Sequence, residues 1–437
     1  MQRDEEEEEE EGQGQPLELH VTMLSGRQVC TAKMCSNDTM LALSQVVHDN
    51  LDARAKTAPL ASLSLLWEGE ELLPSQKLTG LPNEATVQLI RRPREECGEH
   101  MRVAVRCRPW LGSEETMSRG EFDFEAMPAA VNYLSSRQEE LRRLIAPHDL
   151  FCEQESQEEV FQTVAADLVE TVATGTSASI VVFGAKGTGR KYTASGSDRE
   201  PGLVPRCLSH LDDCCKRQKA LHNLDYSFGC SLVRMKNGKV LDMLAKAETE
   251  ADRRRYLREQ PGTGAHVEQL TVRHVDTPQE AGDIFGEARG QAKDEETRSY
   301  RFLGDKTDWL YIVHVTASQR SPAGEVQQRA SSLMIVVTAS VDKVPKNTPH
   351  PTYEFPRWST QALMTTIDAL SKRNRHIPYR DSPLTRLLKE SLGGHHRAAF
   401  VVTISRSATD SNVLSLRVAC RAMQILNRPK AAEWCME

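Results

Sequence analysis

An apolar run that leads directly into a glycine-rich loop constrains the fold of this chain more than any other feature. Residues 178–183, Ala-Ser-Ile-Val-Val-Phe, are short, apolar and rich in β-branched side chains, which predicts a buried strand. Residues 184–193 follow as Gly-Ala-Lys-Gly-Thr-Gly-Arg-Lys-Tyr-Thr, and such glycines let backbone N–H groups turn toward an anion. A strand, a glycine-rich loop and a helix together form the setting of a phosphate-binding loop. We therefore expect an α/β domain built around this segment.

The chemistry of a phosphate loop needs more than glycines. A lysine normally reaches the β- and γ-phosphates, and a Ser or Thr hydroxyl holds magnesium. Here Arg190 stands at the lysine position and Lys191 at the hydroxyl position. A forked guanidinium is not a conservative replacement for an ammonium, and Lys191 would either repel the metal or substitute for its charge. The loop alone leaves two interpretations open: a nucleotide site, or a tight turn with solvated charges.

Composition excludes several classes of protein. The chain of 437 residues is 39% hydrophobic and 27% charged, as expected of a globular protein with a sizeable core. Its net charge of −7 comes from the acidic run Asp4–Glu11, and the remainder is close to neutral, which argues against a globally basic nucleic-acid binder. No apolar stretch is long enough to span a membrane, and the acidic start does not resemble a secretory signal. The eleven cysteines form no C-x-x-C pair, so we expect reduced thiols and neither a disulfide framework nor a zinc site.

The sequence divides into five segments. Residues 1–15 are expected to be a disordered acidic tail, with a regulatory acidic arm as the alternative. Residues 16–92 predict a strand hairpin, a helix to about Leu51 and two further strands, and this order resembles a small α+β, β-grasp ubiquitin-like domain. It lacks a terminal Gly-Gly, so we expect a docking module rather than a conjugated modifier. A linker (93–100), a large domain (101–430) and a short C-terminal tail (431–437) complete the division.

Several motifs of the large domain resemble those of kinesin motor domains, in the family's order. Residues 103–109, Val-Ala-Val-Arg-Cys-Arg-Pro, resemble the family's V-x-V-R-x-R-P opening strand, and residues 201–206 resemble the segment that follows its phosphate loop. Most specific is the run 376–388, His-Ile-Pro-Tyr-Arg-Asp-Ser-Pro-Leu-Thr-Arg-Leu-Leu, which continues into Ser-Leu-Gly-Gly at 391–394. The resemblance implies a kinesin-type P-loop NTPase fold, with a central, mostly parallel sheet and helices on both faces.

The resemblance also exposes departures at the sites that sense and cleave nucleotide. Kinesins carry D-L-A-G-S-E-R in their second switch, and the corresponding residues 337–343 here are Val-Thr-Ala-Ser-Val-Asp-Lys. Val337 thus replaces the metal-side Asp, and Ser340 replaces the Gly whose N–H senses the γ-phosphate. The first switch aligns loosely with Arg301 and residues 304–308, without its serine pair and histidine. Losing these groups removes several kcal/mol of transition-state stabilisation, so we expect little or no hydrolysis and assign no catalytic residue.

The resemblance assigns two binding sites. ATP or ADP remains a possible ligand, whereas Mg²⁺ is doubtful and no residue is assigned to a metal. The residues placed at the nucleotide are Arg106, Pro109, Gly184, Gly187, Thr188, Gly189, Arg190, Lys191 and Tyr192. The residues placed on tubulin are Lys372, Arg373, Arg375, Tyr379, Arg380 and Arg386. Basic side chains suit the acidic surface of tubulin, although a merely solvated basic loop is the alternative.

Three hypotheses follow. The first is a non-hydrolysing, microtubule-binding pseudo-motor in the cytoplasm, on cytoskeletal microtubules or an axoneme, whose ubiquitin-like domain recruits an unknown protein. The second is an active microtubule-stimulated ATPase with an unusual loop, and the third is a scaffold that binds neither nucleotide nor tubulin. Four prolines between residues 344 and 356 are expected to break the relay between pocket and track. The sequence shows no heptad run for a dimeric stalk, so we expect a monomer.

Overall fold

The computed structural model separates the chain into two compact units, Met1–Glu99 and His100–Glu437. In the larger unit it describes residues 100–109, 120–125, 130–135, 141–145, 147–247, 249–260, 264–299, 307–320, 325–342, 356–407 and 409–436. In the smaller unit it describes residues 16–23, 28–36, 63–67, 70–71, 81–91 and 98–99, with a few single positions between them. The predicted acidic tail, most of the predicted linker and the proline-rich segment lie outside the described residues.

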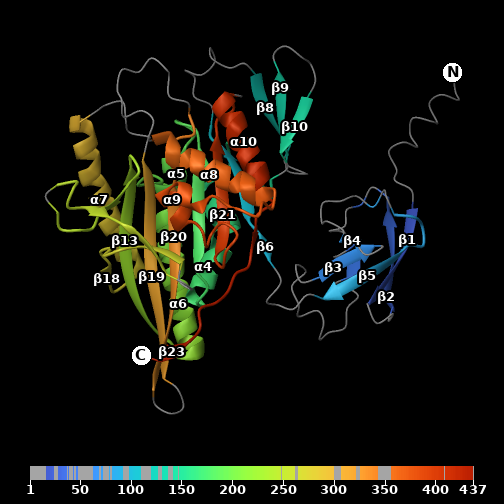
Figure 1. Ribbon diagram of the computed structural model, residues 1–437, viewed down its shortest axis with the longest axis horizontal. Coiled ribbons are helices and arrows are strands. Elements are labelled where there is room, and N and C mark those ends of the chain that lie inside the picture. Colours follow the sequence, from blue (N-terminus) through green and yellow to red (C-terminus); the bar gives the residue numbers. More distant parts are fainter. Residues whose placement is uncertain are drawn as a thin grey trace. The chain divides into compact units, whose positions relative to one another are not determined.

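The smaller unit contains one five-stranded sheet in the order β2-β1-β5-β3-β4 (Figure 1). Its strands are β1 (Pro16–Met23), β2 (Gln28–Cys35), β3 (Leu63–Trp67), β4 (Glu70–Glu71) and β5 (Thr86–Arg91). Strands β1 and β2 form an antiparallel hairpin, whereas β1 and β5 pair in parallel. Leu19, Val21 and Val87 alternate with polar neighbours and pack against helical Leu43 and Val47 in a core of their own. The expected strands are present; the assignment to the ubiquitin-like class stays a prediction.

The larger unit is built on a mixed sheet. Its strands in spatial order are β11 (Asp149–Phe151), β7 (Arg102–Cys107), β21 (Arg397–Ile404), β12 (Ala178–Gly184), β20 (Val326–Val337), β19 (Asp308–Arg320), β13 (Asp225–Lys236), β14 (Lys239–Asp242) and β15 (Arg254–Arg255). The strands from β11 to β20 pair in parallel, but those from β20 to β15 pair antiparallel. The sheet is therefore parallel in one half only, because short connections fold β19 onto β20 and β13 onto β14 as hairpins.

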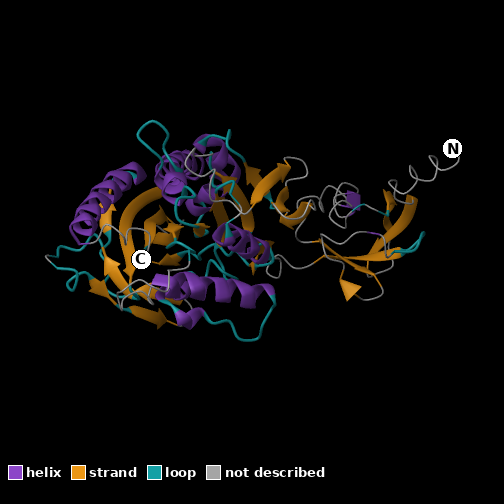
Figure 2. Cartoon of the chain, turned by 90° about the horizontal axis from the view of Figure 1, so that it is seen from above, coloured by secondary structure: helices purple, strands orange, loops and turns teal. Residues whose placement is uncertain are grey.

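Helices cover both faces of this sheet (Figure 2). Alternation along β12 explains the two layers, because Ile180 and Val182 belong to one apolar core and Val181 and Phe183 to the other. The first core is shared with α3 (Gln157–Val164), α4 (Ala166–Ala173), α5 (Arg190–Ser195), α6 (Leu203–His222) and α7 (Pro278–Ser299). The second core is shared with α8 (Pro356–Ser371), α9 (Pro383–Leu387) and α10 (Asp410–Ala422).

Local sequence signals account for several helix ends. Ser156 caps α3, accepting from the N–H of Glu159, while the Glu159 carboxylate accepts from the N–H of Ser156; this is the capping box that the local sequence Ser-Gln-Glu-Glu favours. The helical segment is interrupted at Ala165, between the end of α3 and the start of α4. Among the described residues, none of the helices is both long and apolar enough to cross a membrane.

Short elements complete the larger unit. They are β6 (Glu99–His100), β8 (Gly120–Glu125), β9 (Ala130–Ser135), β10 (Leu141–Ile145), β16 (Leu257–Gln260), β17 (Gly264–Val267), β18 (Arg273–Val275), the 3₁₀ turn Tyr379–Asp381, β22 (Leu426–Asn427) and β23 (Cys435–Met436). Residues 432–436, in the segment predicted as a C-terminal tail, contact the domain. The Ala432 N–H donates to the Gly175 carbonyl at 2.9 Å, β23 pairs with β20, and the Arg329 guanidinium lies 4.6 Å from the Trp434 ring centroid.

Candidate functional site

The glycine-rich loop lies between β12 and α5, as the sequence predicted. Gly184 packs so closely on β21 that a Cβ there would approach the Thr403 carbonyl oxygen to 2.4 Å. Gly187 and Gly189 have φ angles of 78° and 96°, which side chains rarely adopt. The three glycines are therefore required by packing and backbone geometry, whether or not a phosphate binds.

The Arg190 side chain turns into the domain. Only 6% of the residue is exposed, its Nε donates to the Ala185 carbonyl at 3.3 Å, and its guanidinium also donates to the Thr338 carbonyl. Thr338 follows the last residue of β20, so the guanidinium joins the loop to the segment corresponding to the second switch. Lys191, the next residue, is exposed.

A buried carboxylate contributes to the same region. Asp308, the first residue of β19, is 1% exposed and accepts from the Ala339 N–H at 2.7 Å. Burial raises the pKa of this carboxyl to about 6, while the hydrogen bonds from Ala339 and Ser359 and the charge of Arg190 act in the opposite direction. The Arg190 guanidinium thus provides a counter-charge for a carboxylate that has almost no access to water.

A second carboxylate accepts a hydrogen bond from a backbone N–H of the loop itself. The Lys186 N–H donates to Asp342 Oδ2 at 2.5 Å, and the Ser340 hydroxyl donates to the same oxygen. A backbone N–H at this point of a phosphate loop would otherwise be available to an anion. The Asp342 carboxylate oxygen therefore accepts a hydrogen bond that a phosphate oxygen could otherwise accept. Lys343 and residues 301–306 lie outside the described residues.

The side chains of Thr188 and Val337 are also buried in the domain. The Thr188 hydroxyl donates to the Ala185 carbonyl at 2.9 Å and lies 2.8 Å from the Thr403 hydroxyl. Val337 is 5% exposed and ends β20, where it pairs with Val182 and Trp309. A magnesium ion prefers oxygen ligands, but the two positions expected to supply them carry an ammonium, on Lys191, and an isopropyl group, on Val337. This donor set does not fit a magnesium ion.

Two of the residues assigned to the nucleotide, Arg106 and Tyr192, lie together. The Arg106 guanidinium is buried, donates to Gln157 Oε1 at 2.7 Å and to Thr193 Oγ1 at 3.1 Å, and lies 5.5 Å from the centroid of the Tyr192 ring. Burial lowers the pKa of Arg106. Tyr192 is 41% exposed, and its hydroxyl donates to the Glu200 carboxylate.

Two residues that support this cluster were not assigned from the sequence. Gln157 Nε2 donates to the Tyr192 carbonyl at 2.7 Å, and Gln157 is positioned by the capping box of α3, which was a visible signal. Arg108 lies in the V-x-V-R-x-R-P motif, and its Nε donates to the Gly187 carbonyl at 2.5 Å. Pro109 is exposed beside it. An aromatic and cationic rim is therefore retained next to a loop whose interior is filled.

The predicted docking residues lie in the segment between α8 and α9, except Arg386, which lies within α9. Lys372, Arg373 and Arg375 are exposed in the connecting loop, where Lys372 Nζ pairs with Asp368 Oδ2 at 2.8 Å. Tyr379 is different, because its hydroxyl donates to the Leu392 carbonyl at 2.5 Å and burial raises its pKa to about 12. This side chain is held within the domain rather than offered to a partner.

Glu259 on β16 was not assigned from the sequence, yet it contacts two predicted docking residues. Its carboxylate lies 3.1 Å from Arg380 Nη2 and 3.1 Å from Arg386 Nε. The side chain of Arg380 is 84% exposed, and that of Arg386 is 28% exposed. The two arginines hold the pKa of Glu259 below its usual value. The hairpin β16–β17 is thus tied to the predicted docking surface.

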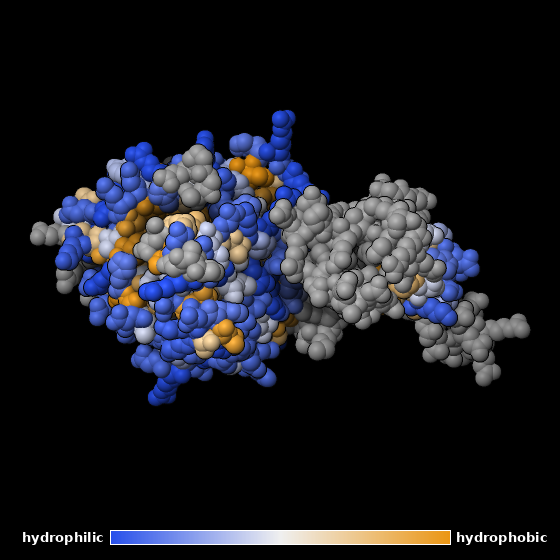
Figure 3. Space-filling view, turned by 90° about the horizontal axis from the view of Figure 1, so that it is seen from below, coloured by the Kyte–Doolittle hydropathy of each residue, from blue (hydrophilic) through white to orange (hydrophobic). Residues whose placement is uncertain are grey.

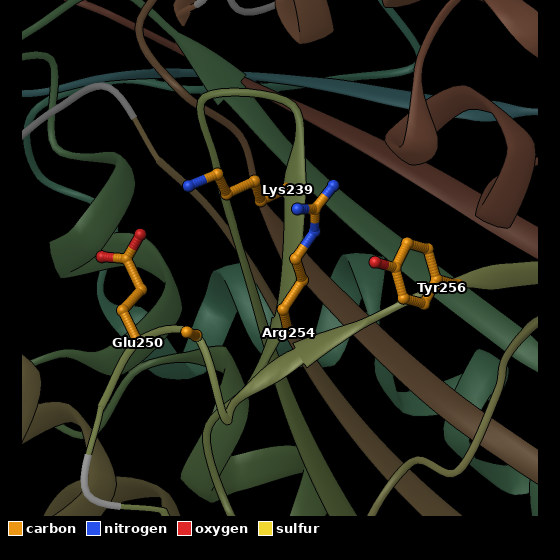
Figure 4. A pocket seen from close by; sticks show the side chains of 5 residues that line it. Lys239, Glu250, Arg254 and Tyr256 are labelled. Carbon is orange, nitrogen blue, oxygen red and sulfur yellow. The ribbon is translucent and has the colours of Figure 1, made fainter.

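A hollow of about 370 Å³ lies elsewhere, at the β14–β15 edge of the sheet (Figure 4). It is lined by Lys239, Glu250, Ala251, Arg254 and Tyr256. Glu250 pairs with Lys236 at 2.7 Å, and the Arg254 guanidinium lies 5.3 Å from the centroid of the Tyr256 ring. The face of the larger unit seen in Figure 3 is mostly hydrophilic, with small separate apolar patches. Both observations favour polar contacts over an apolar ligand pocket.

Comparison with known proteins identifies the family of the larger unit. The sequence matches the family model described as the kinesin motor domain over residues 106–425. Among curated proteins, it is 25% identical over 375 residues to kinesin-like protein KIF3C of Bos taurus, covering 77% of this chain and 46% of that protein. It is 26% identical over 373 residues to kinesin-like protein KIN-5A of Arabidopsis thaliana, covering 80% and 35%. The chain thus spans about half or less of the length of these relatives.

Two solved structures share the fold. One is a KIF14 dimer, residues 391–772, in its two-heads-bound state with AMP-PNP and in complex with a microtubule; its TM-score is 0.69 at 24% identity, over 77% of this chain and 97% of that one. The other is a fast kinesin with a TM-score of 0.67 at 24% identity, over 76% and 94%. The expected kinesin-type α/β fold is confirmed at the level of architecture.

Proposed function

Because the chain belongs to the kinesin motor-domain family, we propose that it binds microtubules as a module that does not hydrolyse ATP. The smaller unit, in this proposal, is a ubiquitin-like module that recruits a further protein. The combination would place the chain on the microtubule cytoskeleton. The observation that carries the loss of hydrolysis is the inward turn of Arg190, whose guanidinium bonds the Thr338 carbonyl instead of facing the outside of the loop.

The contacts around the loop support a pocket that is closed on its phosphate side. Asp342 accepts from the Lys186 N–H, and Arg190 is buried with Asp308 as its counter-charge. A nucleotide whose phosphates bound this loop would have to displace the Asp342 carboxylate. If it also drew Arg190 toward the phosphates, Asp308 would lose its counter-charge, and an uncompensated buried charge is costly. Val337 offers no carboxylate for a metal even if the loop opened. Each loss of about 1.4 kcal/mol of transition-state stabilisation lowers the rate about tenfold.

The rim of the pocket supports weak nucleotide affinity at most. Arg106 and Tyr192 lie together, and an aromatic ring beside a guanidinium is able to stack on a base. A base contact without phosphate contacts leaves ATP and ADP nearly equivalent, because they differ only in the γ-phosphate. Without a difference in affinity between ATP and ADP, exchanging one for the other does not shift the conformational equilibrium, so this proposal excludes a nucleotide-driven cycle.

The exposed charges between α8 and α9 support microtubule docking. Lys372, Arg373, Arg375 and Arg380 are exposed on one continuous segment, and charge complementarity to an acidic polymer steers association. KIF14, which shares the fold, was solved in complex with a microtubule. Arg386 and Arg380 are held by Glu259, so the docking surface includes the β16–β17 hairpin.

The first test measures nucleotide binding and turnover separately. Fluorescent ATP and ADP are titrated into the full chain with and without Mg²⁺, and phosphate release is followed on microtubules. We expect no microtubule-stimulated release and no preference between ATP and ADP. Arg190→Lys with Lys191→Thr should not restore turnover, because Val337 is unchanged. Stimulated release by the unmodified chain would identify an active ATPase and end the proposal.

The second test addresses the docking surface by cosedimentation with microtubules. Changing Lys372, Arg373 and Arg375 to Ala should weaken binding and flatten its salt dependence. The matched control changes Lys216, Arg217 and Lys219 to Ala, which removes the same charge from α6, on the opposite face of the sheet. Equal effects of the two triple variants, or no effect of the first, would show that this is not the docking face.

A further inference from the structure

Glutamate, histidine and cysteine side chains meet between α4 and α6, on the sheet face opposite the proposed docking helices. Glu170 comes from α4, whereas His210 and Cys214 come from α6. One ligand atom from each residue lies within 4.8 Å of those from the other two. These residue types supply oxygen, imidazole nitrogen and thiolate sulfur, a mixed set that suits zinc. The cluster is separate from the nucleotide and docking residues described above.

Helix geometry explains the arrangement. His210 and Cys214 are four residues apart, so their side chains lie on the same face of α6, and α4 packs against that face. His210 Nε2 lies 3.6 Å from Glu170 Oε1, a separation close to that of two ligands of one tetrahedral ion. The Phe161 ring meets the imidazole edge-on, with centroids 5.5 Å apart, and limits its rotation.

The histidine nitrogen points to a missing ligand. His210 Nε2 is shielded from solvent and makes no hydrogen bond among the described residues. A buried polar atom without a partner is costly, and metal coordination satisfies an imidazole nitrogen as well as a hydrogen bond does. Cys214 is 3% exposed, so its sulfur is likewise held away from bulk water.

We propose that Glu170, His210 and Cys214 bind one Zn²⁺ ion, with water as the fourth ligand. Three protein ligands of these types and an open position are typical of tetrahedral zinc. The bound ion would join α4 to α6 across the layer that carries the first core. The site does not depend on nucleotide or microtubule binding, so a test of zinc binding is independent of a test of the proposed function.

Arg217 is the competing cation at this site. Its Nη2 lies 3.1 Å from Glu170 Oε1 and 3.1 Å from Cys214 Sγ, between two of the three ligands. Its side chain is 59% exposed, so it is able to swing into solvent when a divalent ion takes its place. The guanidinium shows that the cluster attracts positive charge, and it also sets the cost that zinc must overcome.

Zinc binds a cysteine as the thiolate, so coordination of Cys214 would release the thiol proton to the solvent.

The experiment titrates Zn²⁺ into the full chain, prepared without a histidine tag, in competition with a chromophoric chelator. One ion per chain should bind, and Co²⁺ in its place should give a thiolate-to-cobalt charge-transfer band. Cys214→Ser should abolish that band, and Glu170→Gln should weaken Zn²⁺ binding by at least about tenfold. Glu170 is exposed, so this second variant tests the site even if the cysteine variant does not fold.

Two controls separate this site from other ligands. Cys215→Ser removes the adjacent buried thiol, which is not part of the cluster, and should leave the cobalt band unchanged. Arg217→Ala removes the competing cation and should tighten Zn²⁺ binding severalfold. The proposal is overturned if no ion binds, if the cobalt spectrum shows no thiolate band, or if neither Cys214→Ser nor Glu170→Gln changes the binding.

Discussion

At the scale of single residues, Arg190 illustrates how one side chain changes the use of a loop. A lysine at this position would project an ammonium toward phosphates, but the longer, forked guanidinium reaches two backbone carbonyls, that of Ala185 in the loop and that of Thr338 after β20. Its charge also partly opposes the rise that burial causes in the pKa of Asp308. We infer that Arg190 stabilises the domain more than it serves a ligand.

Arg190→Ala should therefore destabilise the larger unit by about 2–4 kcal/mol, because it leaves the buried Asp308 carboxylate without its counter-charge. Urea unfolding measures the change in free energy. Lys191→Ala is the matched control, since that neighbour is exposed, and it should change stability by less than about 0.5 kcal/mol. In an Asp308→Asn background, Arg190→Ala should cost less stability than it does in the parent chain. Strict additivity would contradict the pairing.

The raised pKa of Asp308 gives a prediction with a defined sign. The folded value of about 6 lies above the usual unfolded value of about 3.9, so the folded state binds the proton more tightly. The stability that comes from this tighter proton binding is fully present below about pH 4 and is lost as the pH rises through 6. The free energy of unfolding of Asp308→Asn, measured relative to that of the parent chain, should therefore increase between pH 4 and 6. Above pH 6 this difference should stay constant. A difference that does not vary with pH would refute the shifted carboxyl.

At the scale of secondary-structure elements, ion pairs link the β16–β17 hairpin to the predicted docking residues, in addition to the apolar core that the hairpin shares with α9. Glu259 holds Arg380 and Arg386, and both pairs are at least partly exposed. Exposed ion pairs contribute little to stability, so the value of this link lies in how it presents the two arginines. An acidic partner must compete with Glu259 for them.

Glu259→Gln should strengthen microtubule binding about twofold to fivefold at low salt, because it releases two arginines at little cost in stability. Cosedimentation at two salt concentrations measures the effect, which should shrink at the higher one. Glu268→Gln is the matched control on the same hairpin, since Glu268 pairs at 3.0 Å with Arg258, which is not a predicted docking residue. Weaker binding by Glu259→Gln would mean that the hairpin carboxylate itself helps to dock.

At the scale of the whole molecule, the chain carries separate cores. Leu19 and its neighbours pack only within Met1–Glu99, whereas the two cores on the faces of the large sheet lie within His100–Glu437. Each unit buries apolar surface of its own, so each has its own source of stability. The small unit should therefore unfold without the large one.

Calorimetry of the full chain should show two transitions. Leu19→Ala, at a fully buried strand position of the small unit, should lower only one of them, since such a change costs about 2–5 kcal/mol. Leu310→Ala is equally buried on β19 and should lower only the other. A shift of both transitions by either variant would show that the units unfold cooperatively.

Much of this organisation was available from the sequence. The buried strand, the glycine-rich loop, the capping box at Ser156 and the family motifs are local patterns, because each depends on residues that are adjacent or within one helical turn. The family and its fold were confirmed on that basis. The substitutions at Arg190, Lys191 and Val337 were also visible, and they predicted a site unsuited to magnesium.

The directions of the side chains were decided by the tertiary structure. Arg190 turns inward because β19 and β20 bring Asp308 and the Thr338 carbonyl to the loop, and Asp342 reaches the Lys186 N–H across a long separation in sequence. The proposed zinc site depends on packing for the same reason: no cysteine spacing indicated it, but helix packing sets Glu170 beside His210 and Cys214. Sequence patterns report local propensity, whereas these charges were paired by contacts that only the folded sheet and its helices create.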